Sequence, residues 1–224
     1  MHLPLLLLLL LATTSAFLLP PPRSPPQPLH LTPPLTIPPI PTITGTVTLP
    51  GSKSLSNRLL LLAALSEGTT TVTNLLESDD IRYMLDALDV LGVKIDRKSG
   101  TTVVVSGSAG PLPIPSTPSP LTLNLGNAGT AMRPLAAALS YSVLPPTGLT
   151  LDGVPRMRER PIGDLIHGLE QLGGKVRVTG EGEEGCPPVF MEQGRVEGGK
   201  NDMGGTAKMS GKMSVSFQAI CLAL

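Results

Sequence analysis

The chain has 224 residues, enough for one large domain or two small ones with a substantial buried core. Its 17 Lys and Arg residues balance 17 Asp and Glu residues, so no net charge directs the chain towards nucleic acid. Aromatic residues make up 2% of the chain and tryptophan is absent, which disfavours surfaces for base stacking. Cys186 and Cys221 are far apart and fit neither a metal nor a redox spacing, so we expect two free structural thiols.

The amino-terminal residues have features of targeting sequences. An apolar run from Leu3 to Leu11 is too short to span a bilayer, and Thr14-Ser15-Ala16 supplies the small residues of a signal-peptidase site, so residues 1–16 are expected to be a signal peptide. Residues 17–42 are rich in proline and lack acids, which is typical of an extended, disordered transit or linker segment. This arrangement resembles the bipartite leaders of secondary plastids and predicts a plastid protein. The alternative is a secreted protein with a proline linker.

After Ile43 the sequence is typical of a globular α/β protein. Gly68 and Gly92 are expected to end two helices, and Ser78 to cap the second of them. Weak alternation and β-branched residues predict the strands. In chain order we expect a strand at 44–49, a helix at 54–65, a strand at 69–74, a helix from 79 to about 91, and a hairpin of 93–96 with 102–106. Together these segments form one βαβαββ unit.

The same unit then recurs. Residues 121–125 predict a strand and 131–140 a helix, and Leu125-Gly126 precedes Arg133 at the spacing at which Pro50-Gly51 precedes Arg58. A third copy begins near Gly205 and reaches its first helix around residues 217–224, where the chain ends. The predicted fold is therefore an α/β fold of repeated βαβαββ units, with the third unit truncated.

The run from Leu49 to Arg58 is the first candidate site. A glycine turn delivers Lys53 and Arg58 to the start of an apolar helix, where unpaired N–H groups carry partial positive charge. Such a helix start suits a phosphate or carboxylate group. The run is not a P-loop, because the preceding glycine pattern is missing. The alternative is an ordinary capped helix with two solvated cations.

Two further segments lie in the second unit. The glycines of Gly126 to Thr130 allow close approach of a ligand to the backbone, and Asn127 adds an amide. The run from Asp152 to Pro161 contains three arginines that can donate to carboxylate or phosphate in bidentate fashion. Each could instead be a tight turn or a solvated loop. Because three such segments occur in two successive units, we expect them to come together around one set of anionic ligands.

Several multi-residue blocks resemble the amino-terminal half of the 3-phosphoshikimate 1-carboxyvinyltransferases, the EPSP synthase family of enolpyruvyl transferases. These blocks are Leu49 to Arg58, Ser78-Asp79-Asp80, Leu125 to Leu139, and Asp152 to Gly163. The resemblance implies an inside-out α/β barrel in which each domain has three βαβαββ units and two domains close over the ligands. Residues 43–224 would then be the amino-terminal half, with the second domain absent.

The resemblance also implies a reaction. Members of this family transfer the enolpyruvyl group of phosphoenolpyruvate to the 5-hydroxyl of shikimate 3-phosphate and release phosphate, without a metal or an organic cofactor. The implied partners are these two substrates, with no nucleic acid, no membrane after removal of the leader, and a monomeric state at full length. By resemblance, Lys53 contacts both substrates. The other implied contacts are Ser54 and Arg58 for shikimate 3-phosphate, and Asn127, Gly129 and Arg156 for phosphoenolpyruvate.

The third unit of the family carries a Ser-Ser-Gln segment that contacts both substrates. Ser216 and Gln218 match its first and last residues, and Phe217 then replaces the second serine. An ungapped register instead aligns the segment with Ser214 to Ser216. Either register loses one contact, since the motif is incomplete in both.

The resemblance places the acid and base groups of the reaction in the second domain, so no catalytic residue is assigned in this half. We therefore expect the isolated chain to bind substrates weakly and to show no turnover, as a truncated gene product or incomplete gene model would. One alternative is a noncatalytic half-domain that binds shikimate 3-phosphate or assembles with a separate second half. Others are a relative of the UDP-N-acetylglucosamine enolpyruvyl transferases, whose blocks match less well, and a purely structural repeat protein.

Overall fold

A computed structural model of the chain describes residues 38–39, 42–180, 185–193, 196–197, 200–201 and 204–208. The chain divides into two units, Met1–Thr46 and Val47–Leu224. All helices and strands that the structure describes lie in the second unit. The expected signal peptide and most of the proline-rich segment fall outside the described residues, so the boundaries predicted for them stay predictions.

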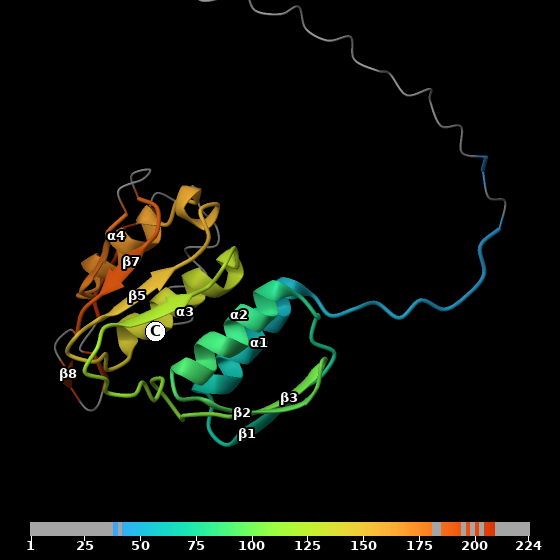
Figure 1. The fold of residues 1–224 in the computed structure, drawn as a ribbon, viewed down its shortest axis with the longest axis horizontal. Helices are drawn as coiled ribbons and strands as arrows, with labels where there is room; N and C mark the ends of the chain where they lie inside the picture. The colour runs from blue at the N-terminus through green and yellow to red at the C-terminus, as the bar shows by residue number, and fades with distance from the viewer. Residues whose placement is uncertain are drawn as a thin grey trace, which may run out of the picture. The chain divides into compact units, whose positions relative to one another are not determined.

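The first α/β repeat contains two helices and an antiparallel sheet (Figure 1). Its elements are α1 (Lys53–Leu65), β1 (Thr69–Val72), α2 (Asp79–Val90), β2 (Lys94–Ser99) and β3 (Thr102–Ser106). The strand order is β1-β3-β2, with both pairs antiparallel. Gly68 and Gly92, which follow the two helices, have φ values of 79° and 85°, the conformation that favours glycine after a helix. The predicted helices, the strand after the first helix and the hairpin are confirmed.

The strand predicted at 44–49 is wrong. Residues 42–50 have no regular secondary structure, and Ile43, Val47 and Leu49 are 83%, 82% and 73% exposed. A strand is stabilised by hydrogen bonds to a neighbouring strand, and this segment pairs with none among the described residues. The first repeat is therefore αβαββ instead of the expected βαβαββ.

The second repeat has the complete βαβαββ pattern. Its elements are β4 (Leu121–Asn124), α3 (Gly129–Tyr141), β5 (Leu149–Asp152), α4 (Gly163–Gln171), β6 (Val176–Val178) and β7 (Val189–Met191). Strand order is β4-β5-β7-β6, in which β4 and β5 are parallel and the other pairs antiparallel. A 3₁₀ turn, η1 (Met157–Glu159), lies between β5 and α4. The helix expected at 131–140 is confirmed and begins earlier, at Gly129.

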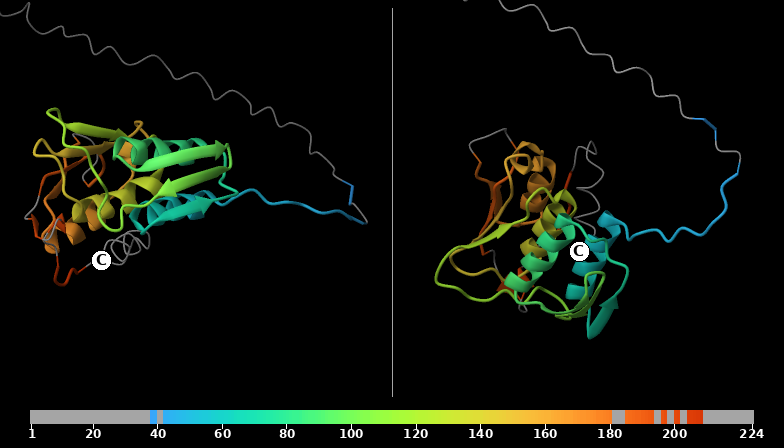
Figure 2. Two further views of the ribbon diagram at one scale, coloured as in Figure 1. Left: turned by 90° about the horizontal axis from the view of Figure 1, so that it is seen from below. Right: turned by 45° about the vertical axis from the view of Figure 1, so that its right-hand side comes forward.

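The helices of the two repeats pack against one another. Helix α1 contacts α2 and α3, while β1 and β3 lie against α1, and β6 packs on α4 (Figures 1 and 2). Helix α3 is buried along most of its length, and its run Ala136-Ala137-Ala138 lets neighbouring elements approach closely. Cys186 is buried and forms no disulfide with another described residue, and Cys221 lies outside the described residues. The core thus brings the starts of helices from both repeats into one assembly.

Little of the expected third repeat is described. Two short strands, β8 (Val196–Glu197) and β9 (Lys200–Asn201), pair antiparallel, and residues 204–208 have no helix or strand. The expected helix at 217–224 lies outside the described residues. None of the helices in the described part of the chain has the length and apolar character needed to cross a membrane.

Candidate anion-binding site

The first candidate segment is the turn that leads into α1. Gly51 packs so closely on the next loop that a Cβ there would lie 1.9 Å from the backbone oxygen of Asn74. Ser52 is the N-cap residue, and its hydroxyl accepts a long hydrogen bond of 3.5 Å from the Leu55 N–H. The first turn of α1 contains no acidic residue. The helix start therefore keeps its attraction for anions.

Lys53 is the first residue of α1, and it forms an ion pair with the start of another helix. Its Nζ lies 3.1 Å from a carboxylate oxygen of Asp80, in the first turn of α2. The two side chains are 49% and 19% exposed. A pair with this exposure contributes about 0–1 kcal/mol to stability. The ion pair between Lys53 and Asp80 is therefore weak enough for an incoming anion to displace.

The other two predicted residues of α1 lie within its first two turns. Ser54 and Arg58 are both half-buried, and Arg58 interacts with neighbouring groups in the fold. Since they are four positions apart, they lie on the same face of the helix. The structure therefore carries a hydroxyl and a guanidinium on one face at the amino-terminal end of α1.

A partly buried hydrogen bond joins the starts of α1 and α3. Asn57 is 1% exposed, and its Nδ2 donates to the Thr130 hydroxyl at 2.8 Å. The Asn57 Oδ1 is also buried and has no hydrogen-bond partner among the described residues. This contact brings the first and second candidate segments together. Asn57 lies in the first sequence block but was assigned no role there; the signal available was a polar amide close to the apolar run that fills the rest of the helix.

The glycine-rich turn before α3 is shaped by close packing. Gly126 has φ 53°, and a Cβ there would lie 2.1 Å from the Tyr83 ring. Asn127 is exposed, whereas Gly129 is the buried first residue of α3. A Cβ at Gly129 would lie 2.8 Å from Nη1 of Arg160. Close approach and a positive φ therefore require glycine at Gly126, whereas what approaches Gly129 is the flexible end of an arginine side chain.

The three arginines of the 152–161 loop have three different environments. Arg158 donates from Nε and Nη2 to the Asp152 carboxylate at 2.9 and 2.5 Å, and this carboxylate raises the pKa of Arg158. Arg156 is 70% exposed and pairs with Glu159. Arg160 reaches back to donate to the backbone oxygen of Asn127 at 3.3 Å. In this structure, Arg160 is the arginine of the loop that contacts the glycine-rich turn.

Arg133, one turn into α3, lies behind the same turn. It is 9% exposed, and its Nη2 donates to the backbone oxygen of Pro161 at 2.6 Å. Its Nε is buried and has no hydrogen-bond partner in the part of the chain that the structure describes. Burial lowers the pKa of Arg133, and the positive charge of Arg160 lowers it further. The sequence analysis used Arg133 only to align the repeats and did not predict it as a site residue.

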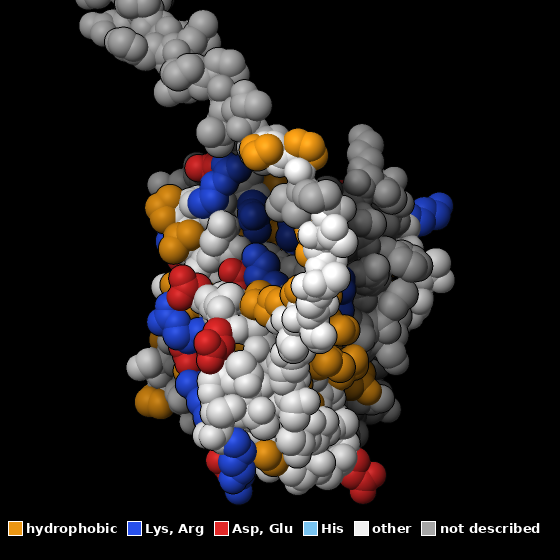
Figure 3. All heavy atoms as spheres, turned by 90° about the vertical axis from the view of Figure 1, so that its right-hand side faces the viewer, with side chains coloured by type: hydrophobic (Ala, Val, Ile, Leu, Met, Phe, Trp, Pro, Cys, Tyr) orange, Lys and Arg blue, Asp and Glu red, His pale blue; other side chains and the backbone are white. Residues whose placement is uncertain are grey.

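The structure thus separates the predicted residues into groups. Lys53, Ser54 and Arg58 lie along the first two turns of α1, which Asn57 ties to α3. Asn127 and Gly129 lie at the start of α3. The Arg156 side chain pairs with Glu159, while Ser216 and Gln218 fall outside the described residues. Lys and Arg side chains lie beside acidic ones on the face drawn in Figure 3, in keeping with these ion pairs. No cluster of three or more potential metal ligands occurs in the described part of the chain.

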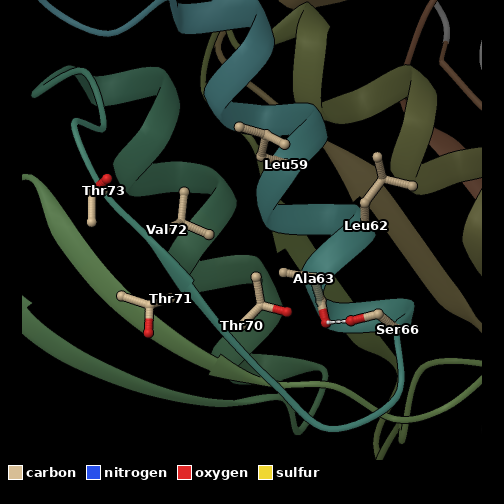
Figure 4. A pocket seen from close by; sticks show the side chains of 8 residues that line it. All are labelled: Leu59, Leu62, Ala63, Ser66, Thr70, Thr71, Val72 and Thr73. Carbon is tan, nitrogen blue, oxygen red and sulfur yellow. Dashed lines mark hydrogen bonds between the residues drawn. The ribbon is translucent and has the colours of Figure 1, made fainter.

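A separate groove runs between α1 and the edge strand β1 (Figure 4). Leu59 and Leu62 line one side and are 42% and 44% exposed, and residues 70–73 line the other. Its lining is apolar or hydroxyl-bearing and carries no charged side chain. The groove therefore lacks the cations that an anionic ligand requires.

Repeated α/β units that gather lysine and arginine at two adjoining helix starts define an α/β protein suited to anionic ligands. Comparison with known proteins makes this specific: the family model for "EPSP synthase (3-phosphoshikimate 1-carboxyvinyltransferase)" matches residues 37–222. The chain belongs to the EPSP synthase family. This confirms the resemblance found in the sequence blocks.

Individual relatives agree. The chain is 52% identical over 185 residues to the chloroplastic 3-phosphoshikimate 1-carboxyvinyltransferase of Brassica napus, covering 82% of this chain and 34% of that protein. It is 53% identical over 162 residues to the 3-phosphoshikimate 1-carboxyvinyltransferase of Paraburkholderia phymatum, covering 72% and 35%. The structure of EPSP synthase from Acinetobacter baumannii matches with a TM-score of 0.66 at 31% identity, covering 80% of this chain and 38% of that one. The chain spans about a third of the length of these curated relatives.

Proposed function

We propose that this chain supplies the amino-terminal part of the substrate site for enolpyruvyl transfer. The reaction moves the enolpyruvyl group of phosphoenolpyruvate to the 5-hydroxyl of shikimate 3-phosphate and releases phosphate, a step in aromatic amino-acid biosynthesis. Family membership supports the reaction class. The observation that carries the proposal for this chain is the partly buried hydrogen bond from Asn57 to Thr130, which holds two cationic helix starts side by side.

The charge of the helix starts fits the two substrates. Both are polyanions, and both bring phosphate and carboxylate groups that suit lysine, arginine and helix N–H groups. In the proposal, Lys53 exchanges Asp80 for substrate oxygens, because their ion pair is partly exposed and weak. Ser54 and Arg58 then hold shikimate 3-phosphate, and Asn127, Gly129 and Arg156 border phosphoenolpyruvate. Arg156 would have to leave Glu159 to do so.

The same structure favours binding without turnover by the 224-residue chain. Proton transfer needs an acid or base within reach of the reacting atoms. Three carboxylates lie near the candidate segments, those of Asp80, Asp152 and Glu159. Each forms an ion pair with a cation of those segments. We therefore propose that this chain binds substrate and does not complete the reaction by itself.

Two measurements test the proposal. Phosphate release, measured with both substrates on the isolated chain, should stay at background, and robust turnover would contradict the inactive state. Calorimetry with shikimate 3-phosphate should give measurable binding that Lys53→Ala weakens at least fivefold. Lys98→Ala is the matched control, since Lys98 forms a similar exposed ion pair with Asp96 in the β2 strand. Equal affinity in wild type and Lys53→Ala would remove Lys53 from the site.

We also propose a plastid location. Curated relatives from Brassica napus and Arabidopsis thaliana are described as chloroplastic. The acid-free proline-rich segment of this chain supports a leader of the bipartite type. A fusion of residues 1–42 to a fluorescent protein should enter the plastid in an alga with secondary plastids. Release of the fusion into the medium would favour the secreted alternative.

A further inference from the structure

Strand β1 has an open edge among the described residues. Its hydrogen-bonded neighbour there is β3, on its other side, in the strand order β1-β3-β2. The groove beside the open edge is walled by α1, where Leu59 and Leu62 are exposed, and by residues 70–73 (Figure 4). Neither β1 nor the described lining of the groove carries a charged residue or a proline, which commonly protect edge strands. This edge can therefore pair with a further strand.

The segment that precedes α1 has the pattern of such a strand. Along residues 44–49, threonine alternates with glycine, valine and leucine, so Val47 and Leu49 share one face of an extended chain. These two side chains are 82% and 73% exposed, and the segment contains no charged residue. Packing this face against Leu59 and Leu62 would remove apolar surface on both sides from water.

The second repeat shows what occupies the corresponding edge there. Strand β4 pairs in parallel with β5, and the N–H of Leu125, just beyond β4, donates to the Asp152 backbone oxygen at 2.8 Å. The repeat alignment places Pro50 opposite Leu125, and proline has no N–H to donate. The chain's own segment therefore lacks one of the hydrogen bonds that hold β4 in place.

The turn into α1 further restricts the chain's own segment. In the register of the second repeat, Thr46 and Thr48 take the inward positions, and the apolar face of the segment points outward. A shift of one residue would turn that face inward, but the turn would have to absorb the shift. Gly51 leaves no room for this, because a Cβ in its place would lie 1.9 Å from the Asn74 backbone oxygen. A strand from another molecule is not tied to this turn and can take the shifted register.

We propose that the edge of β1 receives residues 44–49 of a second copy of this chain, and that two copies exchange these segments to form a symmetric dimer. The apolar face of each segment covers Leu59 and Leu62 of the other protomer. Its threonines lie beside the exposed Thr69 and Thr71 of β1. Because the exchange is reciprocal, the assembly closes at two copies. This dimer goes beyond the proposed function and does not depend on it. It concerns the 224-residue chain, whereas the monomeric state implied by the resemblance refers to the full-length protein.

Sedimentation velocity of the 224-residue chain over a hundredfold range of concentration measures the dimer. We expect a monomer–dimer equilibrium whose dissociation constant rises at least tenfold in Val47→Asp and in Leu62→Glu, because each variant places a charge in the apolar contact. Val143→Asp is the matched control, since Val143 is also exposed but lies beyond the end of α3 and outside the groove lining. Circular dichroism checks that each variant is folded.

Cysteine pairs identify the segment that occupies the groove. All chains carry Cys221→Ser, and Cys186 is buried. A mixture of Val47→Cys chains with Leu62→Cys chains should form, on oxidation, a disulfide-linked dimer that contains one chain of each kind, identified by mass spectrometry. Val143→Cys chains mixed with Leu62→Cys chains should remain unlinked. A chain that carries both Val47→Cys and Leu62→Cys distinguishes a link between copies from a link within one copy.

Four results would overturn the exchange. The first is a monomer at every concentration, and the second is equal weakening of the dimer by Val47→Asp and Val143→Asp. The third is a disulfide between two Leu62→Cys chains without the mixed product, which would mean that the grooves face each other. The fourth is a disulfide within single chains of the double variant, which would mean that each chain's own segment fills its groove.

Discussion

Asp80→Asn tests how Lys53 is kept available for a substrate. Lys53 and Asp80 are 3.1 Å apart, and a partly exposed pair of this kind contributes about 0–1 kcal/mol. A substrate that takes Lys53 must give up this interaction, so the variant removes a cost of up to about 1 kcal/mol, or about fivefold in affinity. It also removes a negative charge near a polyanion. We expect shikimate 3-phosphate to bind about twofold to fivefold more tightly.

The measurement is calorimetry with shikimate 3-phosphate at low and at high salt. The gain should shrink as ionic strength rises, because exposed charges are screened within about 8–10 Å. Asp96→Asn is the control, since it removes the partner of Lys98 in the same way. Stability should fall by no more than about 1 kcal/mol, since Asp79 still provides an acid in the first turn of α2. Weaker binding of the substrate by Asp80→Asn would refute the idea of competition and would make Asp80 a positioning residue.

Two further substitutions test the packing that brings the helix starts together. Gly51→Ala should lower the free energy of unfolding by about 1–3 kcal/mol, because its methyl group would lie 1.9 Å from the Asn74 backbone oxygen. The control in urea unfolding is Gly204→Ala, whose added Cβ would meet no atom of the described residues within 4 Å. Equal stabilities of the two variants would contradict this account of the packing at Gly51. Asn57→Ala should cost about 1 kcal/mol through the lost, partly buried hydrogen bond. A double variant with Thr130→Val should cost little more than either single variant, and strictly additive losses would show that the bond contributes nothing.

The sequence predicted the elements that depend on local chemistry. Helix α2 follows from a periodic apolar stripe that includes Ile81, Met84 and Leu88, and Gly68 and Gly92 adopt positive φ after α1 and α2. The hairpin of β2 and β3 likewise needs only a short turn between two runs of strand-forming residues. The repeat then predicted the second unit from the first. In each case, residues close in the chain determine the result.

Contacts between segments far apart in the sequence were harder to predict from the sequence. Lys53 and Asp80 were recognised in separate motifs, but their ion pair depends on how α1 packs against α2. The approach of Arg160 to Arg133 was missed because sequence patterns favour opposite charges as partners, and this pair brings two cations together. Sequence reasoning treated the loop arginines as equivalent donors. The fold makes them different by giving Arg158 a carboxylate and Arg160 a backbone oxygen.

The strand missing from the first repeat can be understood by comparing the two units. Strand β1 of the first repeat corresponds to β5 of the second repeat. Strand β5 pairs with the parallel strand β4, which precedes α3. The repeat alignment places residues 46–49 opposite 121–124, so Thr46 and Thr48 would occupy the inward positions of Leu121 and Leu123. In that register the segment would bury hydroxyls and expose its apolar side chains. A one-residue shift of the register would turn the apolar side chains inward, but it would change the length of the turn into α1. The side chains of 44–49 therefore gain little apolar burial from the place that the repeat assigns to them, and β1 is an edge strand among the described residues, with the exposed groove beside it.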